Sequence, residues 1–206
     1  MDGATELLLF LLSVVFISLS GVMMPGPVFA VTIAKAYKSK TAGVLIALGH
    51  GLVEFPLMFL IYFGLADIFT NITVQKTIGF AGGLVLIFMG FQTFKARGKH
   101  EEEKQNFTHS SLIVGVLTTV ANPYFFIWWA TIGFALITRT YAFGILGFLL
   151  FSITHWSCDL TWDTIVSATI FKSKHLWTER VQTLIFGFCF AVLVVFGIWF
   201  IATALL

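Results

Sequence analysis

The sequence predicts an all-α integral membrane protein with six transmembrane helices, arranged as two inverted three-helix repeats. First, the 206-residue chain is 58% hydrophobic and only 11% charged, which is far too apolar for a soluble domain of this length. Second, six apolar runs each reach the roughly 20 residues that cross a bilayer. Third, a strongly polar stretch divides these runs into two groups of three. We therefore expect the protein in the cell membrane, in contact with the lipid bilayer.

The six apolar runs are each expected to form one membrane-spanning helix. They lie at about residues 5–34, 42–69, 77–96, 110–137, 141–171 and 181–206. The first run is unlike a cleaved signal peptide, because it opens with Asp2 and Glu6 instead of lysines and lacks a small-residue cleavage site. We expect it to stay in the mature protein.

The basic residues predict how the chain is oriented in the membrane. Ten of the twelve follow the first, third and fifth runs: Lys35, Lys38, Lys40, Lys95, Arg97, Lys99, Lys104, Lys172, Lys174 and Arg180. Only Lys76 and Arg139 lie in loops of the opposite side. Because cytoplasmic loops carry an excess of Lys and Arg, the first, third and fifth loops should be cytoplasmic. Both termini are then expected outside the cell.

The polar stretch indicates two halves of similar length. We expect a first three-helix repeat at residues 1–96, a cytoplasmic linker at 97–109 and a second three-helix repeat at 110–206. With three helices in each half, homologous halves would enter the membrane in opposite orientations. Both halves carry a proline-containing interruption in their first run and a His-x-x-x-acid pattern in their second. This shared order favours an inverted repeat.

Two interruptions of the apolar runs mark the expected substrate site. Pro25, Gly26 and Pro27 interrupt the first run, and Asn122 and Pro123 interrupt the fourth. Proline removes a backbone donor, and the polar backbone groups that it leaves free are tolerated in a membrane only where protein or a water-filled cavity satisfies them. A pair of interrupted segments in corresponding positions indicates a transporter's central site. The alternative is a simple proline kink in each packed helix.

Four ionisable residues lie near the middle of their runs: His50 and Glu54 in the second, and His155 and Asp159 in the fifth. A charged Asp at a helix centre costs about 3 kcal/mol, so such residues should face the bundle interior and form pairs. The i, i+4 spacing places each His on the same face as its acid. Since the two helices run antiparallel, we expect His50 beside Asp159, and Glu54 beside His155 one helical turn away.

The chemistry of these four groups leaves three interpretations open. Imidazoles and carboxylates carry protons through a transport cycle, bind metals such as Zn or Mn, or pair as polar contacts between helices. A metal needs its ligands within a sphere of about 2 to 2.5 Å radius, whereas the expected pairs are a helical turn apart. We therefore predict no metal ligands, and we expect Glu54, buried and facing a histidine, to carry protons.

The sequence contains no signature of an enzyme. It has no HExxH, Walker or nucleophile-elbow pattern and offers no soluble domain for a nucleotide. Cys158 and Cys189 lie within apolar runs and form no CxxC motif. We therefore predict no catalytic residues, no cofactor and no nucleic-acid partner. The sequence is compatible with a homo-oligomer.

Four features of the chain occur together: Pro25-Gly26-Pro27, the glycine-bearing helix from Gly43 to Gly64-Leu65, the polar linker, and Asn122-Pro123 followed by Trp128-Trp129. In these features the chain resembles the LysE/RhtB family of amino-acid exporters, over essentially its whole length. It implies secondary export of amino acids or small amino-acid derivatives without ATP. The two His-x-x-x-acid pairs are not typical of the lysine or homoserine exporters. The wider superfamily that this family resembles also contains cadmium, nickel and manganese exporters.

These observations give one expected function and two alternatives. We expect amino-acid export by proton antiport, because moving a cationic substrate out of a negative interior costs about 2.3 kcal/mol per 100 mV and an incoming proton offsets that charge. The first alternative is a divalent-metal exporter. The second is a structural or assembly membrane protein, whose polar residues would pair in a closed core without a polar cavity.

Overall fold

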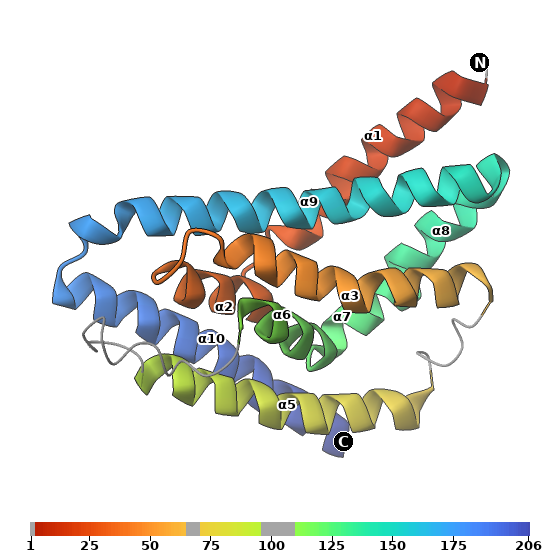
Figure 1. Ribbon diagram of the computed structural model, residues 1–206. Coiled ribbons are helices and arrows are strands. Elements are labelled where there is room, and N and C mark those ends of the chain that lie inside the picture. Colours follow the sequence, from red (N-terminus) through yellow and green to blue (C-terminus); the bar gives the residue numbers. More distant parts are fainter. Residues whose placement is uncertain (1–2, 65–70, 96–109) are drawn as a thin grey trace.

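The computed structural model describes residues 3–64, 71–95 and 110–206, and every secondary-structure element in these residues is helical. The expected linker at 97–109 lies outside them. Figure 1 shows a bundle in which short helices lie between longer ones. The all-helical fold class predicted from the sequence is confirmed.

The first apolar run forms two helices separated by a break. Helix α1 spans Gly3–Val22 and α2 spans Pro27–Ala36. Pro27 is the first residue of α2, where its missing N–H has no helical partner to lose. Gly26 precedes it in an extended conformation, with φ of −130° and no side-chain cap. The helix therefore breaks where the sequence places its two prolines.

Helix α3, Ala42–Tyr62, follows α2 after a short turn at residues 37–41. It ends earlier than the apolar run that extends to residue 69, and Gly64 adopts a left-handed conformation with φ of 87° directly after it. Helix α5, Ile72–Lys95, begins before the apolar run expected from residue 77. The side chain of Asn71 accepts hydrogen bonds from the N–H groups of Thr73 and Val74. This N-cap starts the helix before the apolar run, so the first turn of the helix contains polar residues.

The fourth apolar run is broken in the same way as the first. Helix α6, Ser111–Val120, ends before Asn122, whose side chain accepts a hydrogen bond from the N–H of Tyr124 at 3.1 Å. Pro123 then opens α7, Pro123–Trp128. A π-helical turn, Trp129–Gly133, continues it into α8, Phe134–Thr140. The second interruption therefore separates α6 from α7.

The last two helices are long and continuous. A 3-10 turn at Tyr141–Phe143 leads to Gly144, which has φ of 62° and begins α9, Gly144–Ser173. Helix α10, Glu179–Leu205, starts after Thr178, whose hydroxyl accepts a hydrogen bond from the N–H of Val181. Both are longer than the roughly 20 residues that cross a bilayer.

Five helical stretches in the described part of the chain are long and apolar enough to cross a membrane, which makes this a multi-pass membrane protein. They are Gly3–Val22, Ala42–Tyr62, Ile72–Lys95, Pro123–Leu176 and Glu179–Leu205. The count differs from the six predicted because α6 has only 10 residues, whereas α7 to α9, with the 3-10 turn Lys174–Leu176 that follows them, form one stretch of 54 residues. That stretch is longer than a single crossing requires.

The short helix α2 lies in the interior of the bundle, whereas α6 packs mainly against α3 and leaves Ile113, Leu117 and Val120 exposed. Helix α2 contacts α3, α6, α9 and α10, and eight of its ten residues are buried. Helices α5 and α10 form the most extensive pair on one side, and α9 lies on the other (Figure 1). The breaks therefore bring two helix ends, with their free backbone groups, inside the protein.

Glycines allow the central helices to approach closely. A Cβ on Gly43 would collide with the carbonyl oxygen of Asp163, and one on Gly49 with that of Leu112. Backbone-to-backbone contact through small residues is a common way for membrane helices to pack. These two glycines of α3 thus serve close packing against α9 and α6.

Candidate functional site

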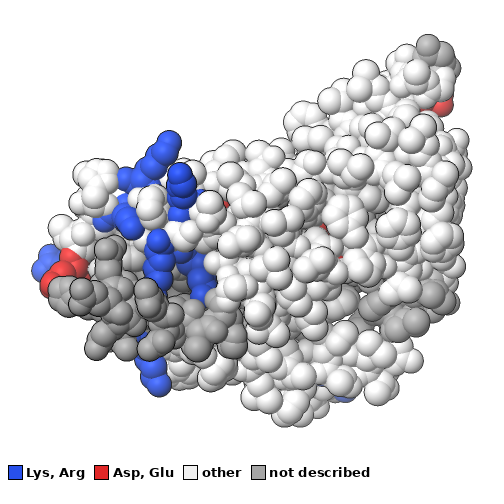
Figure 2. Space-filling model, in the orientation of Figure 1, with Lys and Arg blue, Asp and Glu red and all other residues white. Residues whose placement is uncertain are grey.

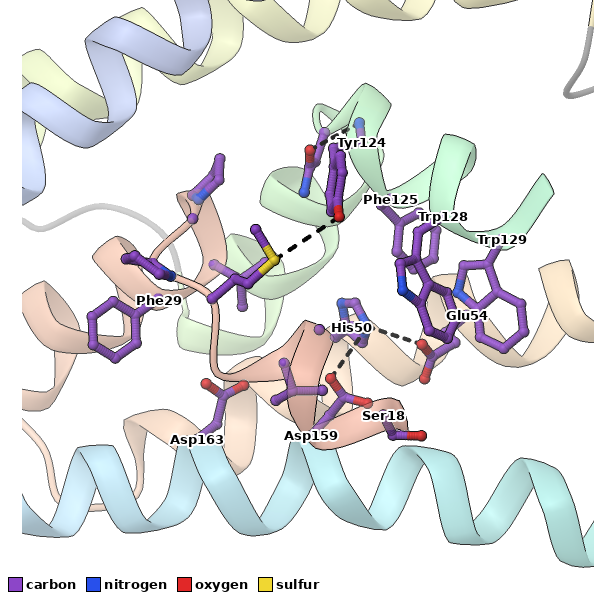
Figure 3. A pocket seen from close by; sticks show the side chains of 18 of the residues that line it. Ser18, Phe29, His50, Glu54, Tyr124, Phe125, Trp128, Trp129, Asp159 and Asp163 are labelled. Carbon is purple, nitrogen blue, oxygen red and sulfur yellow. Dashed lines mark hydrogen bonds and ion pairs between the residues drawn. The ribbon is translucent and has the colours of Figure 1, made fainter. Parts of the chain in front are cut away.

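A cavity of about 270 Å³ lies between the two breaks. Met24, Pro25, Gly26 and Pro27 line it from one side, and Asn122 and Tyr124 line it from the other. The hydroxyl of Tyr124 points across to the sulfur of Met24, 3.9 Å away (Figure 3). Residues of α1, α3, α7, α9 and α10 and of the π-helical turn complete the wall.

The structure gathers most of the predicted site residues at this cavity. Eight of the nine line it: Pro25, Gly26, Pro27, His50, Glu54, Asn122, His155 and Asp159. Pro123 does not line it and instead lies against α5, where its Cγ would be 3.9 Å from a Cβ on Gly79. Pro123 therefore shapes the break without facing the cavity.

The four ionisable residues form one cluster at the polar end of the cavity. Glu54 Oε1 lies 3.1 Å from His50 Nε2 and 3.2 Å from His155 Nε2. Asp159 completes the ring, with Oδ1 3.9 Å from His50 Nε2 and Oδ2 3.8 Å from His155 Nε2. All four side chains belong to α3 or α9, the two central helices that face each other.

This convergence contradicts the expectation of two pairs separated by a helical turn. Four residues of an α-helix rise by about 6 Å. The long side chain of Glu54 spans that rise and reaches the imidazole of His50 on its own helix. Since the same oxygen also meets His155, the carboxylate joins the two levels into one site. The argument against a metal site based on their separation is therefore wrong.

Two hydroxyl groups hold the histidines in orientation. Thr119 donates its own proton to the carbonyl of Gly115 at 2.8 Å, so its oxygen accepts the Nδ1–H of His50, also at 2.8 Å. The hydroxyl of Ser18 lies 2.7 Å from Nδ1 of His155. With each Nδ1 held in this way, both Nε2 atoms are directed at the carboxylates.

Aromatic rings enclose the cluster. The ring of His155 lies 5.1 Å from that of Trp128 and 5.0 Å from that of Trp129, measured between centroids. The ring of Phe125 meets His50 edge-on at 5.2 Å. Glu54 is only 1% exposed. Such a buried, aromatic surrounding lowers the local dielectric constant and strengthens electrostatic interactions inside the site.

Two carboxylate oxygens of the cluster have no hydrogen-bond partner. They are Glu54 Oε2 and Asp159 Oδ2, and both are buried within the described part of the chain. Buried polar atoms are nearly always satisfied, so such atoms need an explanation such as a water molecule or an ion. Among the described residues that line the cavity there is no Lys or Arg. The polar end is thus suited to a cationic group.

Asp163 is a further acidic residue of the cavity that the sequence analysis missed. It lies one turn beyond Asp159 on α9, is 4% exposed, and accepts a hydrogen bond from the hydroxyl of Thr32 at 3.2 Å. The signal was present, because Asp163 continues the spacing of four that links His155 to Asp159. Ser18 and Thr119 gave no such signal, since hydroxyl residues are common in apolar helices.

Comparison with known proteins adds two similarities that cover nearly the whole chain. The model of the family described as LysE type translocator matches residues 19–204. A protein of Bacillus subtilis (strain 168) named "Putative amino acid efflux protein YcgF" is 28% identical over 201 residues, which cover 92% of this chain and 93% of that protein. No solved structure matches significantly.

Proposed function

Because the chain belongs to the LysE type translocator family, we propose that it is a secondary transporter that exports amino acids or small amino-acid derivatives from the cell. Family membership makes it a transporter and not an enzyme. The amino-acid substrate is supported by the name of the Bacillus relative. The observation that carries the proposal is the cavity between two broken helices, with its ionisable cluster at one end.

The six crossings form two inverted repeats in this proposal, at residues 1–96 and 110–206, joined by the cytoplasmic linker 97–109. Three kinds of contact support the symmetry. The second helices of the halves, α3 and α9, contact each other, and so do the third helices, α5 and α10. The first helix of each half also contacts the second helix of the other, as α1 does with α9 and α6 with α3. A pseudo-two-fold axis produces such reciprocal contacts.

The proposed orientation places both termini outside the cell. Figure 2 supports it, because Lys and Arg gather over one end of the molecule and the N-terminal end of α1 lies away from them. The positive-inside rule assigns the basic end to the cytoplasm. The cavity then lies between a cytoplasmic and an external face, as alternating access requires.

The substrate lies in the cavity with its ammonium group at the acidic cluster. The unpartnered oxygens of Glu54 and Asp159 offer it hydrogen-bond acceptors. The substrate carboxylate points to the start of α2, where Gly26 gives no side-chain cap and the positive end of the helix dipole favours an anion. Apolar lining residues such as Phe29, Phe196 and Trp199 hold the side chain.

Proton antiport is the proposed coupling. An incoming proton offsets the charge of an exported cation, which otherwise costs about 2.3 kcal/mol per 100 mV of membrane potential. Glu54 is the proposed carrier, because both histidines meet the same oxygen of its buried carboxylate. A substrate ammonium group and a proton would then compete for one carboxylate, which is the simplest way to couple two opposite fluxes.

Divalent-metal export is the second candidate function, and it is favoured by the convergence of the four ionisable residues. The cavity itself argues against a structural membrane protein with a closed polar core. Counterflow in liposomes, with a panel of amino acids and a panel of divalent metals, tests both candidates. Amino-acid counterflow supports the main proposal, whereas counterflow of metals alone would replace it with the second.

A further inference from the structure

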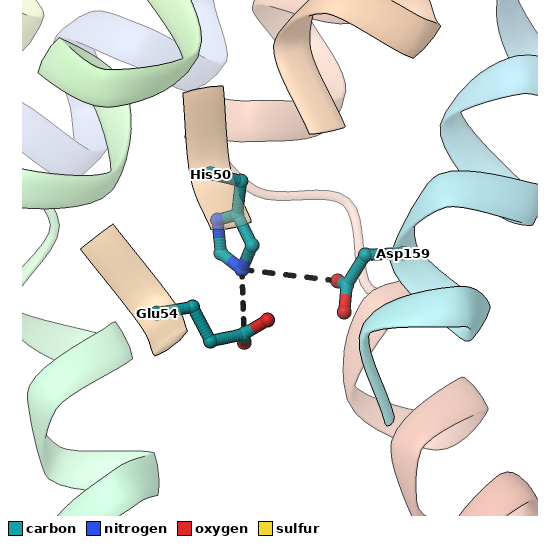
Figure 4. Close-up of side chains that lie close together, drawn as sticks. All are labelled: His50, Glu54 and Asp159. Carbon is teal, nitrogen blue, oxygen red and sulfur yellow. Dashed lines mark hydrogen bonds and ion pairs between the residues drawn. The ribbon is translucent and has the colours of Figure 1, made fainter. Parts of the chain in front are cut away.

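We propose that His50, Glu54 and Asp159 form a binding site for a divalent transition-metal ion, best matched by Zn²⁺, with His155 as the nearest fourth donor. Figure 4 shows the three side chains pointing toward one another from α3 and α9. The metal uses the carboxylates that the proposed function assigns to the substrate ammonium group, so metal and substrate would compete for them. The experiments below measure metal binding alone, so their outcome does not depend on which substrate is exported.

The spacing of the donor atoms fits a metal ion. One donor atom each of His50, Glu54 and Asp159 lies within 4.8 Å of the other two. The closest contacts of His50 Nε2 to the carboxylates are 3.1 Å and 3.9 Å. In a tetrahedral zinc site with bonds near 2.0 to 2.1 Å, neighbouring donors are about 3.3 Å apart. The two contacts of His50 bracket this value, and the two carboxylate donors, which lie within 4.8 Å of each other, would move closer on binding.

The imidazole of His50 is oriented as a metal ligand requires. Because Thr119 accepts the Nδ1–H of His50, the Nε2 atom is left to bind a cation. Metal-binding histidines nearly always have the other ring nitrogen held by such a partner, which fixes the tautomer and the ring plane. His155 has the same arrangement, with Ser18 at its Nδ1 and Nε2 directed at Glu54.

The carboxylates have oxygen atoms without a hydrogen-bond partner, and they carry the negative charge that balances a cation. Glu54 Oε2 and Asp159 Oδ2 are buried and have no hydrogen-bond partner among the described residues. With both carboxylates ionised and both imidazoles neutral, the four groups carry two negative charges, which a divalent cation neutralises. Buried charges of one sign are costly unless they are paired or coordinate a metal. A bound ion therefore accounts for both observations.

The donor set selects the class of ion. Imidazole nitrogen suits Zn, Cu, Fe and Ni, whereas Mg and Ca prefer sites made of oxygen alone. The thiol of Cys158 donates to the carbonyl of Thr154, so it is held on its own helix. Zn²⁺ accepts mixed nitrogen and oxygen donors in tetrahedral geometry without redox chemistry.

Equilibrium dialysis of the detergent-purified protein against Zn²⁺, followed by metal analysis, tests the site without any transport. We expect one Zn²⁺ per chain, no comparable retention of Mg²⁺, and more than about tenfold weaker binding in His50→Gln and in Asp159→Asn. His175→Ala is the control, because His175 is exposed and lies outside the cavity. Size-exclusion profiles like that of the wild type show that the variants are folded.

A second pair of variants tests the orientation of His50. Thr118 and Thr119 are both fully buried in α6 and both bond to a carbonyl four residues earlier, but only Thr119 contacts His50. Thr119→Val should weaken Zn²⁺ binding roughly 10- to 100-fold, and Thr118→Val should leave it unchanged. The proposal is overturned if the wild type retains no Zn²⁺, or if His50→Gln and Asp159→Asn bind it as tightly as the wild type.

Discussion

Glu54 Oε1 lies 3.2 Å from Nε2 of His155, although the two residues are separated by 101 positions in the sequence. This contact joins α3 of the first half to α9 of the second, at the polar end of the cavity. A movement of the two halves against each other therefore acts directly on this contact. In the proposed function, the carboxylate of Glu54 is therefore the group that connects substrate, proton and conformation most directly.

The first prediction concerns coupling. Glu54→Gln keeps the shape of the side chain and removes its charge, so an imposed pH gradient should no longer accelerate export, while some substrate exchange remains. The measurement is flux in proteoliposomes with and without the gradient. Glu179→Gln changes an exposed acid at the start of α10 and should respond like the wild type. If Glu54→Gln still responds fully to the gradient, Glu54 is not the proton carrier.

The second prediction concerns the break in the first helix. Pro27→Ala restores an N–H group and allows α2 to extend toward α1, which should lower transport and leave the amount of folded protein unchanged. Gly26→Ala should act in the same direction, and a Cβ there has ordinary space, 3.9 Å from the carbonyl oxygen of Met24. Flux is measured beside Gly187→Ala, whose new Cβ would meet no atom within 4 Å. Unchanged flux in both break variants would show that the break is a structural kink without a role in transport.

The third prediction concerns close packing. Gly49→Ala should lower stability by about 1 to 3 kcal/mol, because its Cβ collides with the backbone carbonyl of Leu112 and forces α3 and α6 apart. Thermal unfolding in detergent measures the effect. Gly187→Ala places the same methyl group in open space on a helix and should be neutral or slightly stabilising. Equal unfolding temperatures for the two variants would show that the backbones of α3 and α6 are far enough apart at Gly49 to accept a methyl group.

The fourth prediction concerns orientation. A cysteine at His175, in the basic loop after α9, should be protected from an impermeant thiol reagent in whole cells, whereas one at Leu206 should react. Both positions are exposed, and the native Cys158 and Cys189 are buried. Permeabilised cells should label both positions and thus provide the control. The opposite pattern would place both termini inside the cell.

The sequence predicted the helical class and the position of both breaks, because apolar length and proline act locally. Gly26 and Pro27 separate two helices, and Asn122 and Pro123 begin a new one. It did not predict the number of continuous spanning stretches. That number depends on whether a helix resumes after its break, which is decided by capping and by packing against neighbouring helices.

The sequence could not predict the geometry of the cluster, for a different reason. The spacing of four placed His50 with Glu54 and His155 with Asp159 correctly on their helices. How α3 and α9 rotate and slide against each other depends on contacts between residues far apart in the sequence, such as the close approach of Gly43 to the backbone of Asp163. The hydroxyl partners come from other helices, so no local pattern could reveal them.

In the proposed function, the cavity between the two breaks carries amino acids out of the cell. Counterflow in proteoliposomes tests it most directly: vesicles loaded with an unlabelled amino acid should transiently accumulate the labelled form from outside. For at least one amino acid, the wild type should show this accumulation, and Asp159→Asn should reduce it strongly, because the substrate ammonium group loses a carboxylate. Absence of counterflow for every amino acid, together with counterflow of a divalent metal that is lost in His50→Ala, would contradict the claim.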